Sequence, residues 1–325
     1  MSIRGGQRAR AATGTLRELA LRKPVLVMLW LAGLYLLYVT VEYYLARDRL
    51  GGDAHAYWLT GQPWYTPYTI APNHNDAYLY SPAFAQLIRP ATWLPWPVFL
   101  ALWMSAETGA FLWLLRPLGW RLALPLVLWC APEIVIGNVL GFLGIAVVAS
   151  FTRPWSWSAM VLTKPVLAVG AVWFLVKREW QSFAVSIGLA VLVTGASVAL
   201  DPAGWSRWLQ FLTTHATDSQ GSLLVRAATA LAIVICAALA GRRWMVPFAL
   251  LVATPVFAGA PSLTILAAVP RLVTLRDRAG DDASTGGVLE AGDASSPGSA
   301  SAGGARTEAF GGSRGRSHRI GDECS

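Results

Sequence analysis

Charged side chains are scarce in this chain of 325 residues. Only 14% of the residues are charged, 55% are hydrophobic, and the mean hydropathy is +0.47. These values lie far outside the usual composition of a soluble domain of this size and exclude a water-soluble fold. Several apolar runs reach or approach the ~20 residues of a bilayer-spanning helix, and none shows the period-two alternation of a membrane barrel. The sequence therefore predicts an all-α, polytopic integral membrane protein.

Cysteine and histidine are also few, with three and four residues respectively. The cysteines do not pair in sequence, and the histidines lack the spacing of zinc ligands. The chain has no phosphate-binding glycine-rich loop after a strand and no nucleophile elbow, so nucleotide chemistry at the cytoplasmic face is not expected. The sequence predicts no metal, no cofactor and no nucleic-acid partner.

The first apolar segment, residues 25–45, follows a basic N-terminus. Residues 1–24 contain six Lys or Arg side chains, which favours a cytoplasmic N-terminus by the positive-inside rule. We interpret residues 25–45 as a signal anchor. The alternative is a cleaved signal peptide, but such peptides have a shorter apolar core, of roughly 7 to 15 residues, and a small-residue cleavage site, which is missing here.

The polar intervals divide the chain into three parts. Residues 1–24 form the cytoplasmic N-terminus, residues 25–275 form a membrane domain, and residues 276–325, rich in Gly and Ser, are expected to be a disordered cytoplasmic tail. Within the membrane domain, residues 46–96 are rich in Pro, Tyr and Trp and predict a structured extracytoplasmic loop. Residues 83–94 of this loop are too short to span and predict an interfacial or re-entrant helix.

Eight further apolar spans follow this loop. They are expected at 97–115, 122–136, 139–151, 154–176, 182–200, 222–241, 244–258 and 261–275. The alternation of basic residues between their ends predicts about ten transmembrane or half-membrane helices in the cell membrane, surrounded by membrane lipids, with both termini cytoplasmic.

Two of these intervals contain a predicted helix break. A single straight helix over 154–176 would bury Lys164 near the bilayer midplane, at a cost of at least ~2.5 to 3.5 kcal/mol. Pro165 instead ends a helix at Lys164 and leaves two half-helices that are too short to cross ~30 Å of hydrocarbon. We expect this break to line a water-filled cavity open to the outer side. Gly137 and Asn138 predict a second break of the same kind.

An acidic residue, Asp53, follows the first span closely. Gly51 and Gly52 allow a sharp turn that places its carboxylate at the membrane surface, near His55. A partly desolvated carboxylate there can act as a general base toward a hydroxyl. The alternative is that Asp53 is only the N-cap of a helix over 54–61, which spacing alone favours.

Several basic residues are candidates for binding a phosphate group on the outer side. They are Lys164, Arg89, Arg207, His215 and Arg226. Lysine as a point charge and arginine as a planar fork are the expected partners of a lipid-linked phosphate. For the arginines the alternative is snorkelling at the interface. For Lys164 the alternative is a structural ion pair with Glu133.

Short motifs in a fixed order carry a resemblance to a known family. The motifs are Gly52-Asp53 with Tyr57-Trp58 and Gly61, Tyr80-Ser81-Pro82-Ala83-Phe84, Gly137-Asn138-Val139-Leu140, Leu162-Thr163-Lys164-Pro165, Trp205-Ser206-Arg207-Trp208-Leu209 and Gly221-Ser222-Leu223. In this order they resemble glycosyltransferase family 87, over roughly residues 25 to 235. The chain differs from the family pattern in having Tyr80-Ser81-Pro82 for Tyr-Pro-Pro and no second amide after Asn138.

The resemblance implies a GT-C-like fold and a function. The function is inverting transfer of a sugar, mannose in type, from a polyprenyl-phosphate donor to a glycolipid or glycan acceptor at the extracytoplasmic face. In this family Asp53 would match the acid that deprotonates the acceptor hydroxyl, without a nucleotide and usually without a metal. We expect the substrate-binding residues to be His55, Tyr57, Arg89, Asn138, Lys164, Arg207 and His215.

Two other classes of function remain open at this stage. Broken helices around a polar midplane site are also typical of transporters and flippases, although the chain shows no convincing internal repeat between 25–150 and 154–275. The departures from the family pattern also allow a non-catalytic membrane subunit of cell-envelope assembly.

Overall fold

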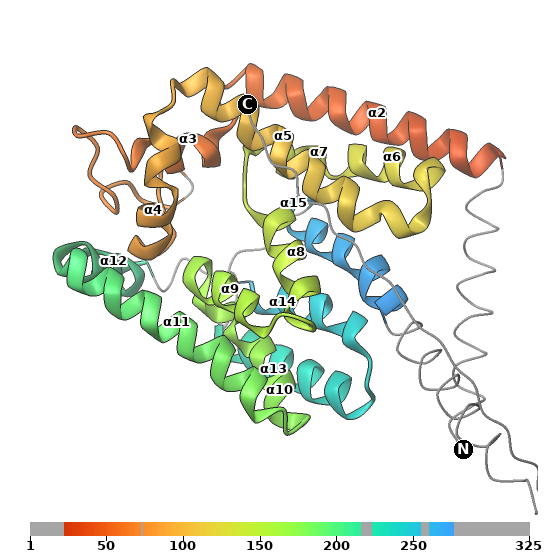
Figure 1. Cartoon of the computed structure of the whole chain (residues 1–325). Helices are drawn as coiled ribbons and strands as arrows, with labels where there is room; N and C mark the ends of the chain where they lie inside the picture. The colour runs from red at the N-terminus through yellow and green to blue at the C-terminus, as the bar shows by residue number, and fades with distance from the viewer. Residues whose placement is uncertain (1–22, 73, 216–222, 255–259, 276–325) are drawn as a thin grey trace, which may run out of the picture. The chain divides into compact units, whose positions relative to one another are not determined.

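The computed structural model describes residues 23–72, 74–215, 223–254 and 260–275 (Figure 1). All of them belong to the first of two compact units, Met1–Ala279. Most of the predicted basic N-terminus and the whole predicted tail, residues 276–325, lie outside the described residues.

The described residues form helices and contain no strand, which confirms the all-α fold class. The elements are α2 (Lys23–Leu45), α3 (Gly52–Leu59), α4 (Pro82–Ile88), η1 (Arg89–Trp93), α5 (Trp96–Leu115), η2 (Arg116–Leu118), α6 (Trp120–Trp129), α7 (Ala131–Ile136), α8 (Leu140–Ser150), η3 (Pro154–Ser156), α9 (Trp157–Thr163), η4 (Pro165–Ala171), α10 (Val172–Val176), α11 (Trp180–Leu200), α12 (Pro202–Thr214), α13 (Leu223–Leu239), η6 (Arg243–Met245), α14 (Val246–Ala253), α15 (Ala260–Leu263) and η7 (Thr264–Ala268). Elements labelled η are 3-10 helices.

Three of the described helical segments are long and apolar enough to cross a membrane. They are Lys23–Leu45, Trp96–Leu118 and Trp180–Leu200. The other apolar helices of the described part are shorter, between 10 and 17 residues. The number of spans therefore stays a prediction, as do the sides on which the termini lie.

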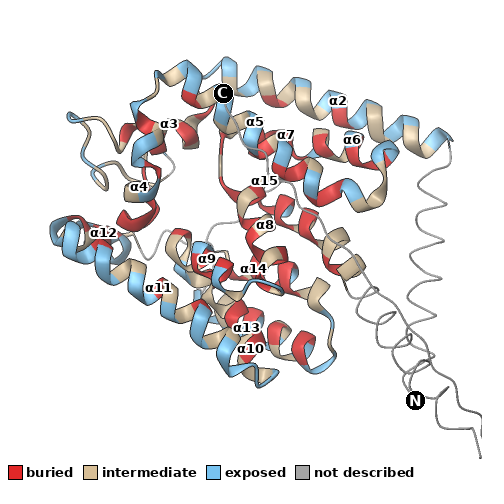
Figure 2. Cartoon of the chain, viewed as in Figure 1, coloured by how far each residue is buried: buried red, intermediate tan, exposed pale blue. Residues whose placement is uncertain are grey.

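Burial separates a central helix from peripheral ones (Figure 2). Eight of the eleven residues of α8 are buried, and this helix packs against α5, α9 and η7. In α2 only Gly33 and Thr40 are buried, and apolar side chains such as Met28 are 68% exposed. An apolar helix with so much exposed surface is typical of a helix that faces lipid.

Glycine permits the close approach of α2 to α6. A Cβ atom on Gly33 would lie 3.0 Å from Cβ of Leu128 and 3.2 Å from the carbonyl oxygen of Pro125. Small residues at such crossings let helix backbones pack closely, which is how helices associate in a bilayer.

Several boundaries differ from those expected. The apolar segment 122–136 is two helices, because α6 ends at Trp129 and Pro132 lies in the first turn of α7. Proline is tolerated there but lacks the N–H that would continue the preceding helix. The predicted interfacial helix 83–94 is present as α4 followed by η1. A helix that the sequence interpretation did not identify, α12, begins at Pro202.

Candidate functional site

A main-chain hydrogen bond at the N-cap fixes the start of α3, the helix that carries Asp53. Gly51 adopts the left-handed conformation with φ 70° and is the N-cap of α3. Its amide donates to the carbonyl of Val135 over 2.8 Å, which ties α3 to α7. Asp53 is the second residue of α3, and its carboxylate makes no capping hydrogen bond. The N-cap hypothesis for Asp53 was therefore wrong, because α3 begins at Gly52, two residues before the predicted start at residue 54.

The second predicted break, at Gly137 and Asn138, is confirmed and lies directly against α3. Gly137 is left-handed, with φ 73°, and a Cβ there would be 2.6 Å from Cβ of Ala54. The indole of Trp103 donates to the carbonyls of Gly137 and Asn138 over 2.9 and 3.1 Å. The break is thus a fixed feature with satisfied backbone groups.

The side chain of Asn138 binds two tyrosine hydroxyls. Its Oδ1 accepts hydrogen bonds from the hydroxyls of Tyr80 over 2.7 Å and of Tyr57 over 3.4 Å. The rings of Tyr57 and Tyr80 contact each other edge-on, with centroids 5.2 Å apart. Burial raises the pKa of Tyr80 well above its ordinary value, so its hydroxyl stays protonated and donates. We call Asp53, Tyr57, Tyr80, Asn138 and Lys164 the central cluster.

Lys164 joins this cluster from the break between α9 and η4. The helix ends at Thr163, Lys164 has an extended backbone, and Pro165 begins η4, as the sequence predicted. Its ammonium lies 5.5 Å from the centroid of the Tyr80 ring. Within the described part of the chain it makes no hydrogen bond, and Glu133 does not come within the 4.0 Å of an ion pair. The alternative of a direct Lys164–Glu133 pair is therefore not observed.

The environment of Asp53 changes its acidity. The side chain is half-buried, and burial raises its pKa from 3.8 to about 6, while the positive charge of Lys164 acts in the opposite direction. A carboxylate with a pKa near neutrality is suited to general-base catalysis. The charge of Lys164 thus acts on Asp53, although no hydrogen bond or ion pair joins the two side chains among the described residues.

Two buried glutamates lie behind the cluster, at the start of α8. Oε1 of Glu133 accepts from the amide of Leu140 over 3.2 Å, and Oε1 of Glu107 accepts from the amide of Gly141 over 3.3 Å. Both side chains are fully buried, and the second oxygen of each has no partner among the described residues. An acid inside an apolar span is itself a functional signal, so Glu107 could have been selected from the sequence.

The other predicted basic residues lie apart from the central cluster. Arg89 begins η1 and is exposed, and Arg226 donates to the carbonyl of Val252 over 3.0 Å. Arg207 is exposed on α12, and Nδ1 of His215 lies 3.0 Å from the carbonyl of Phe211. Among the described residues, no hydrogen bond joins Arg89, Arg207 or His215 to the central cluster.

The position of α12 nevertheless links it to the outer loop. The indole of Trp208 donates to the carbonyl of Leu79 over 3.3 Å, and the Phe211 ring lies 5.9 Å from that of Tyr68. Tyr68 also contacts Tyr78, with centroids 5.7 Å apart. Tyr78 in turn lies 6.1 Å from Tyr80, so a continuous row of aromatic rings joins α12 to the central cluster.

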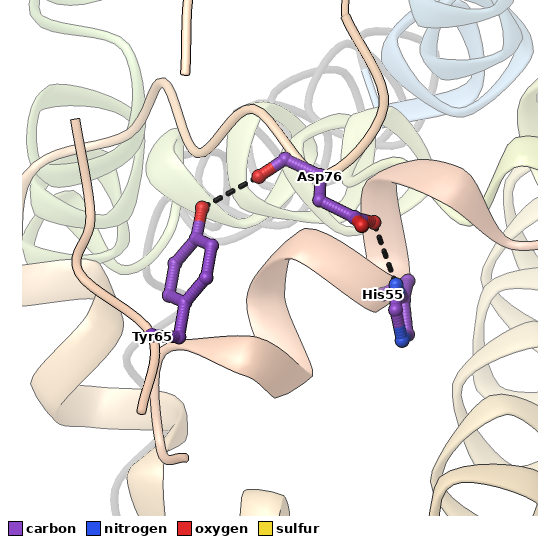
Figure 3. A network of polar contacts seen from close by, with 3 residues as sticks. All are labelled: His55, Tyr65 and Asp76. Atoms are coloured by element: carbon purple, nitrogen blue, oxygen red, sulfur yellow. Dashed lines mark hydrogen bonds and ion pairs between the residues drawn. The ribbon is translucent and has the colours of Figure 1, made fainter. Parts of the chain in front are cut away.

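His55 points away from Asp53. Its Nδ1 lies 2.6 Å from Oδ1 of Asp76, and the hydroxyl of Tyr65 donates to the carbonyl of Asp76 over 2.5 Å (Figure 3). Residues two positions apart on a helix do not face each other. The sequence predicted that Asp53 lies near His55; the two residues share α3 but lie on different faces of it.

Comparison of the sequence with known protein families identifies the family of this chain. Residues 78–289, more than half of the chain, match the sequence model of glycosyltransferase family 87. The chain belongs to glycosyltransferase family 87 and is a membrane glycosyltransferase. No curated protein and no solved structure matches it. The matched region contains Tyr80, Asn138 and Lys164 but begins after Asp53.

Proposed function

We propose that the protein transfers a sugar, mannose in type, from a polyprenyl-phosphate donor to a glycolipid or glycan acceptor on the extracytoplasmic side of the membrane. The proposal is supported by two charged groups of the central cluster. Burial raises the pKa of Asp53 to about 6, and the ammonium of Lys164, beside the Tyr80 ring, makes no hydrogen bond or ion pair among the described residues.

Asp53 is the proposed general base. Its carboxylate takes the proton from the acceptor hydroxyl as the oxygen attacks the anomeric carbon of the donor sugar. The bond between that carbon and the phosphate oxygen breaks, and the polyprenyl phosphate leaves with the electron pair. Attack opposite to the leaving group inverts the anomeric configuration.

Lys164 is the proposed partner of the phosphate. Negative charge develops on the leaving phosphate, and a fixed positive charge stabilises it most strongly where water is excluded. The break at Pro165 holds the lysine backbone, and the Tyr80 ring lies beside the ammonium. The exposed residues Arg89 and Arg207 and the partly buried His215 are proposed to act farther out, on the headgroup side of the substrates.

The Asp53→Asn variant tests the proposal. An amide of the same shape cannot accept the proton, so transfer of labelled mannose from polyprenyl-phosphate-mannose to membrane glycolipids should fall at least about a hundredfold, as is typical when a general base is removed. Asp48→Asn is the matched control, because Asp48 is an exposed acid of the same loop. Both variants should elute as folded protein in detergent. Normal turnover in Asp53→Asn would remove this acid from the mechanism.

A further inference from the structure

A second polar group lies on the opposite face of α3 from Asp53. Residues two positions apart on a helix are about 200° apart around its axis, so His55 faces away from the central cluster. There it meets Asp76, which the outer loop brings back to α3 (Figure 3). Asp76 has φ 64°, a left-handed conformation that aspartate tolerates better than most residues.

This pair is accessible, unlike the buried glutamates behind the central cluster. The side chains of His55 and Asp76 are 31% and 35% exposed. In the part of the chain that the structure describes, the carboxylate of Asp76 has no partner other than His55, so its Oδ2 is open to a ligand. A carboxylate with a free oxygen and an imidazole with a free nitrogen offer acceptors and a donor side by side.

Two indole rings contact the histidine of this pair. The His55 ring lies edge-on to Trp96, with centroids 4.6 Å apart, and is stacked on Trp58 at 5.8 Å. Trp93 of the adjacent η1 is 79% exposed. Aromatic rings present large apolar faces beside polar groups, and this combination suits a sugar ring, which has apolar C–H faces and hydroxyls at its edge.

We propose that His55 and Asp76 form a second carbohydrate subsite, which binds a sugar unit of the acceptor away from the hydroxyl that reacts. This inference rests on the proposed function. The carboxylate of Asp76 accepts hydrogen bonds from sugar hydroxyls, and a neighbouring indole packs against the ring. A helix with its side chains is about 10 to 12 Å across, so the subsite takes a unit other than the one at Asp53.

A purely structural role would have different consequences. The outer loop is already attached by the hydroxyl of Tyr65, which donates to the main chain of Asp76, and by that of Tyr68, which donates to the carbonyl of Tyr80 over 2.8 Å. Neither bond uses the Asp76 carboxylate. Tyr65→Phe therefore weakens the attachment of the loop and keeps the proposed sugar contacts, whereas Asp76→Asn does the reverse.

Binding of α-linked manno-oligosaccharides to the full chain in detergent tests the subsite. Wild type, Asp76→Asn and Tyr65→Phe are titrated with the monosaccharide and with the tetrasaccharide, and indole fluorescence is recorded. We expect Asp76→Asn to bind the tetrasaccharide about tenfold more weakly, the usual effect of losing a hydrogen bond to a charged group. Tyr65→Phe should bind it within about twofold of wild type, and the weak binding of the monosaccharide should not change.

Three outcomes would overturn the subsite: no tetrasaccharide binding by wild type, equal binding by wild type and Asp76→Asn, or an equal loss in both variants. The last would show that the pair only holds the loop. Two measurements on Asp53→Asn separate this inference from the proposed function: the transfer assay tests the base, and the same tetrasaccharide titration tests the subsite. If Asp53→Asn transfers sugar normally, the proposed base fails, and the subsite is still decided by binding.

Discussion

Asp53 is set apart from the other outer acids by its surroundings. Its neighbour in the loop, Asp48, is exposed, whereas Asp53, in the first turn of α3, is half-buried. Burial raises its pKa to about 6 despite the nearby charge of Lys164. The residue therefore changes its protonation state within the pH range in which membrane enzymes are assayed.

This pKa predicts the acid limb of the pH profile. Below pH 6 the carboxyl is protonated and cannot accept the hydroxyl proton, so the transfer rate should fall about tenfold for each pH unit. Above about pH 7 the carboxylate is fully formed and the rate should level off. Initial rates with saturating donor between pH 4.5 and 8 measure this limb. A rate that is constant down to pH 4.5 would contradict Asp53 as the base.

At the residue scale, the sequence predicted where a residue lies along the helices better than which side chain it contacts. Lys164 could be placed at a break because burying its charge in a straight helix is costly and Pro165 follows. The partner of His55 could not be predicted, because Asp76 reaches it through a loop whose path depends on the Tyr65 and Tyr68 hydroxyls. Tyr80 was noticed only as part of a motif, since nothing in the sequence shows that Asn138 binds its hydroxyl.

At the scale of elements, the contact between α3 and the Gly137 break positions Asp53. Gly137→Ala would place a methyl group 2.6 Å from Cβ of Ala54 and force an alanine into φ 73°. The left-handed conformation alone costs about 1 to 2 kcal/mol. We expect a lower melting temperature and a lower transfer rate, because α3 must move away from the break. Thermal unfolding in detergent and the transfer assay measure the two effects.

Two further variants separate the causes. Gly188→Ala is the matched control, since a Cβ on this α11 residue would meet nothing within 4 Å and alanine favours a helix, so its stability should not fall. In the double variant Ala54→Gly, Gly137→Ala the crowding is relieved but the backbone strain stays, so activity should recover more than stability. If Gly137→Ala were as stable and active as wild type, the close approach would have no role.

The elements also show where apolar patterns mislead. The run 122–136 has continuous hydrophobicity, so its division between α6 and α7 depends only on Pro132, whose effect is hidden because proline is acceptable in a first helical turn. The α12 helix was missed because its polar and apolar residues alternate between faces. Such a helix lies along a surface and does not span it.

For the whole molecule, membrane topology is the main prediction that is still untested. With the N-terminus cytoplasmic, Arg121 should lie on the cytoplasmic side and Arg89 on the outer side, and both side chains are exposed. In a background with the three native cysteines replaced by serine, Arg89→Cys should react with a membrane-impermeant maleimide in intact cells. Arg121→Cys should react only after the cells are opened. Equal labelling of both in intact cells would contradict the assigned orientation.

The family was recognisable from the order of weak motifs, and membership of the family was confirmed by a match over residues 78–289. The predicted number of membrane segments was not confirmed, because only three described segments have the length and hydropathy of a full span. Short helices that end inside a hydrophobic layer leave no clear signal in composition. Their ends depend on packing around α8, which a single sequence does not encode locally.

The attachment of Gly51 to Val135 isolates the proposed base from the first helix. α2 contacts α6 and α7 along one side and leaves most of its surface exposed, whereas the start of α3 is hydrogen-bonded to the main chain of α7. Contact with the lipid and the proposed catalysis therefore depend on two separate helices, α2 and α3, that are only a few residues apart in the chain. A change of lipid chain length should then act on the exposed side of α2 while the main-chain bond to α7 keeps Asp53 in its place.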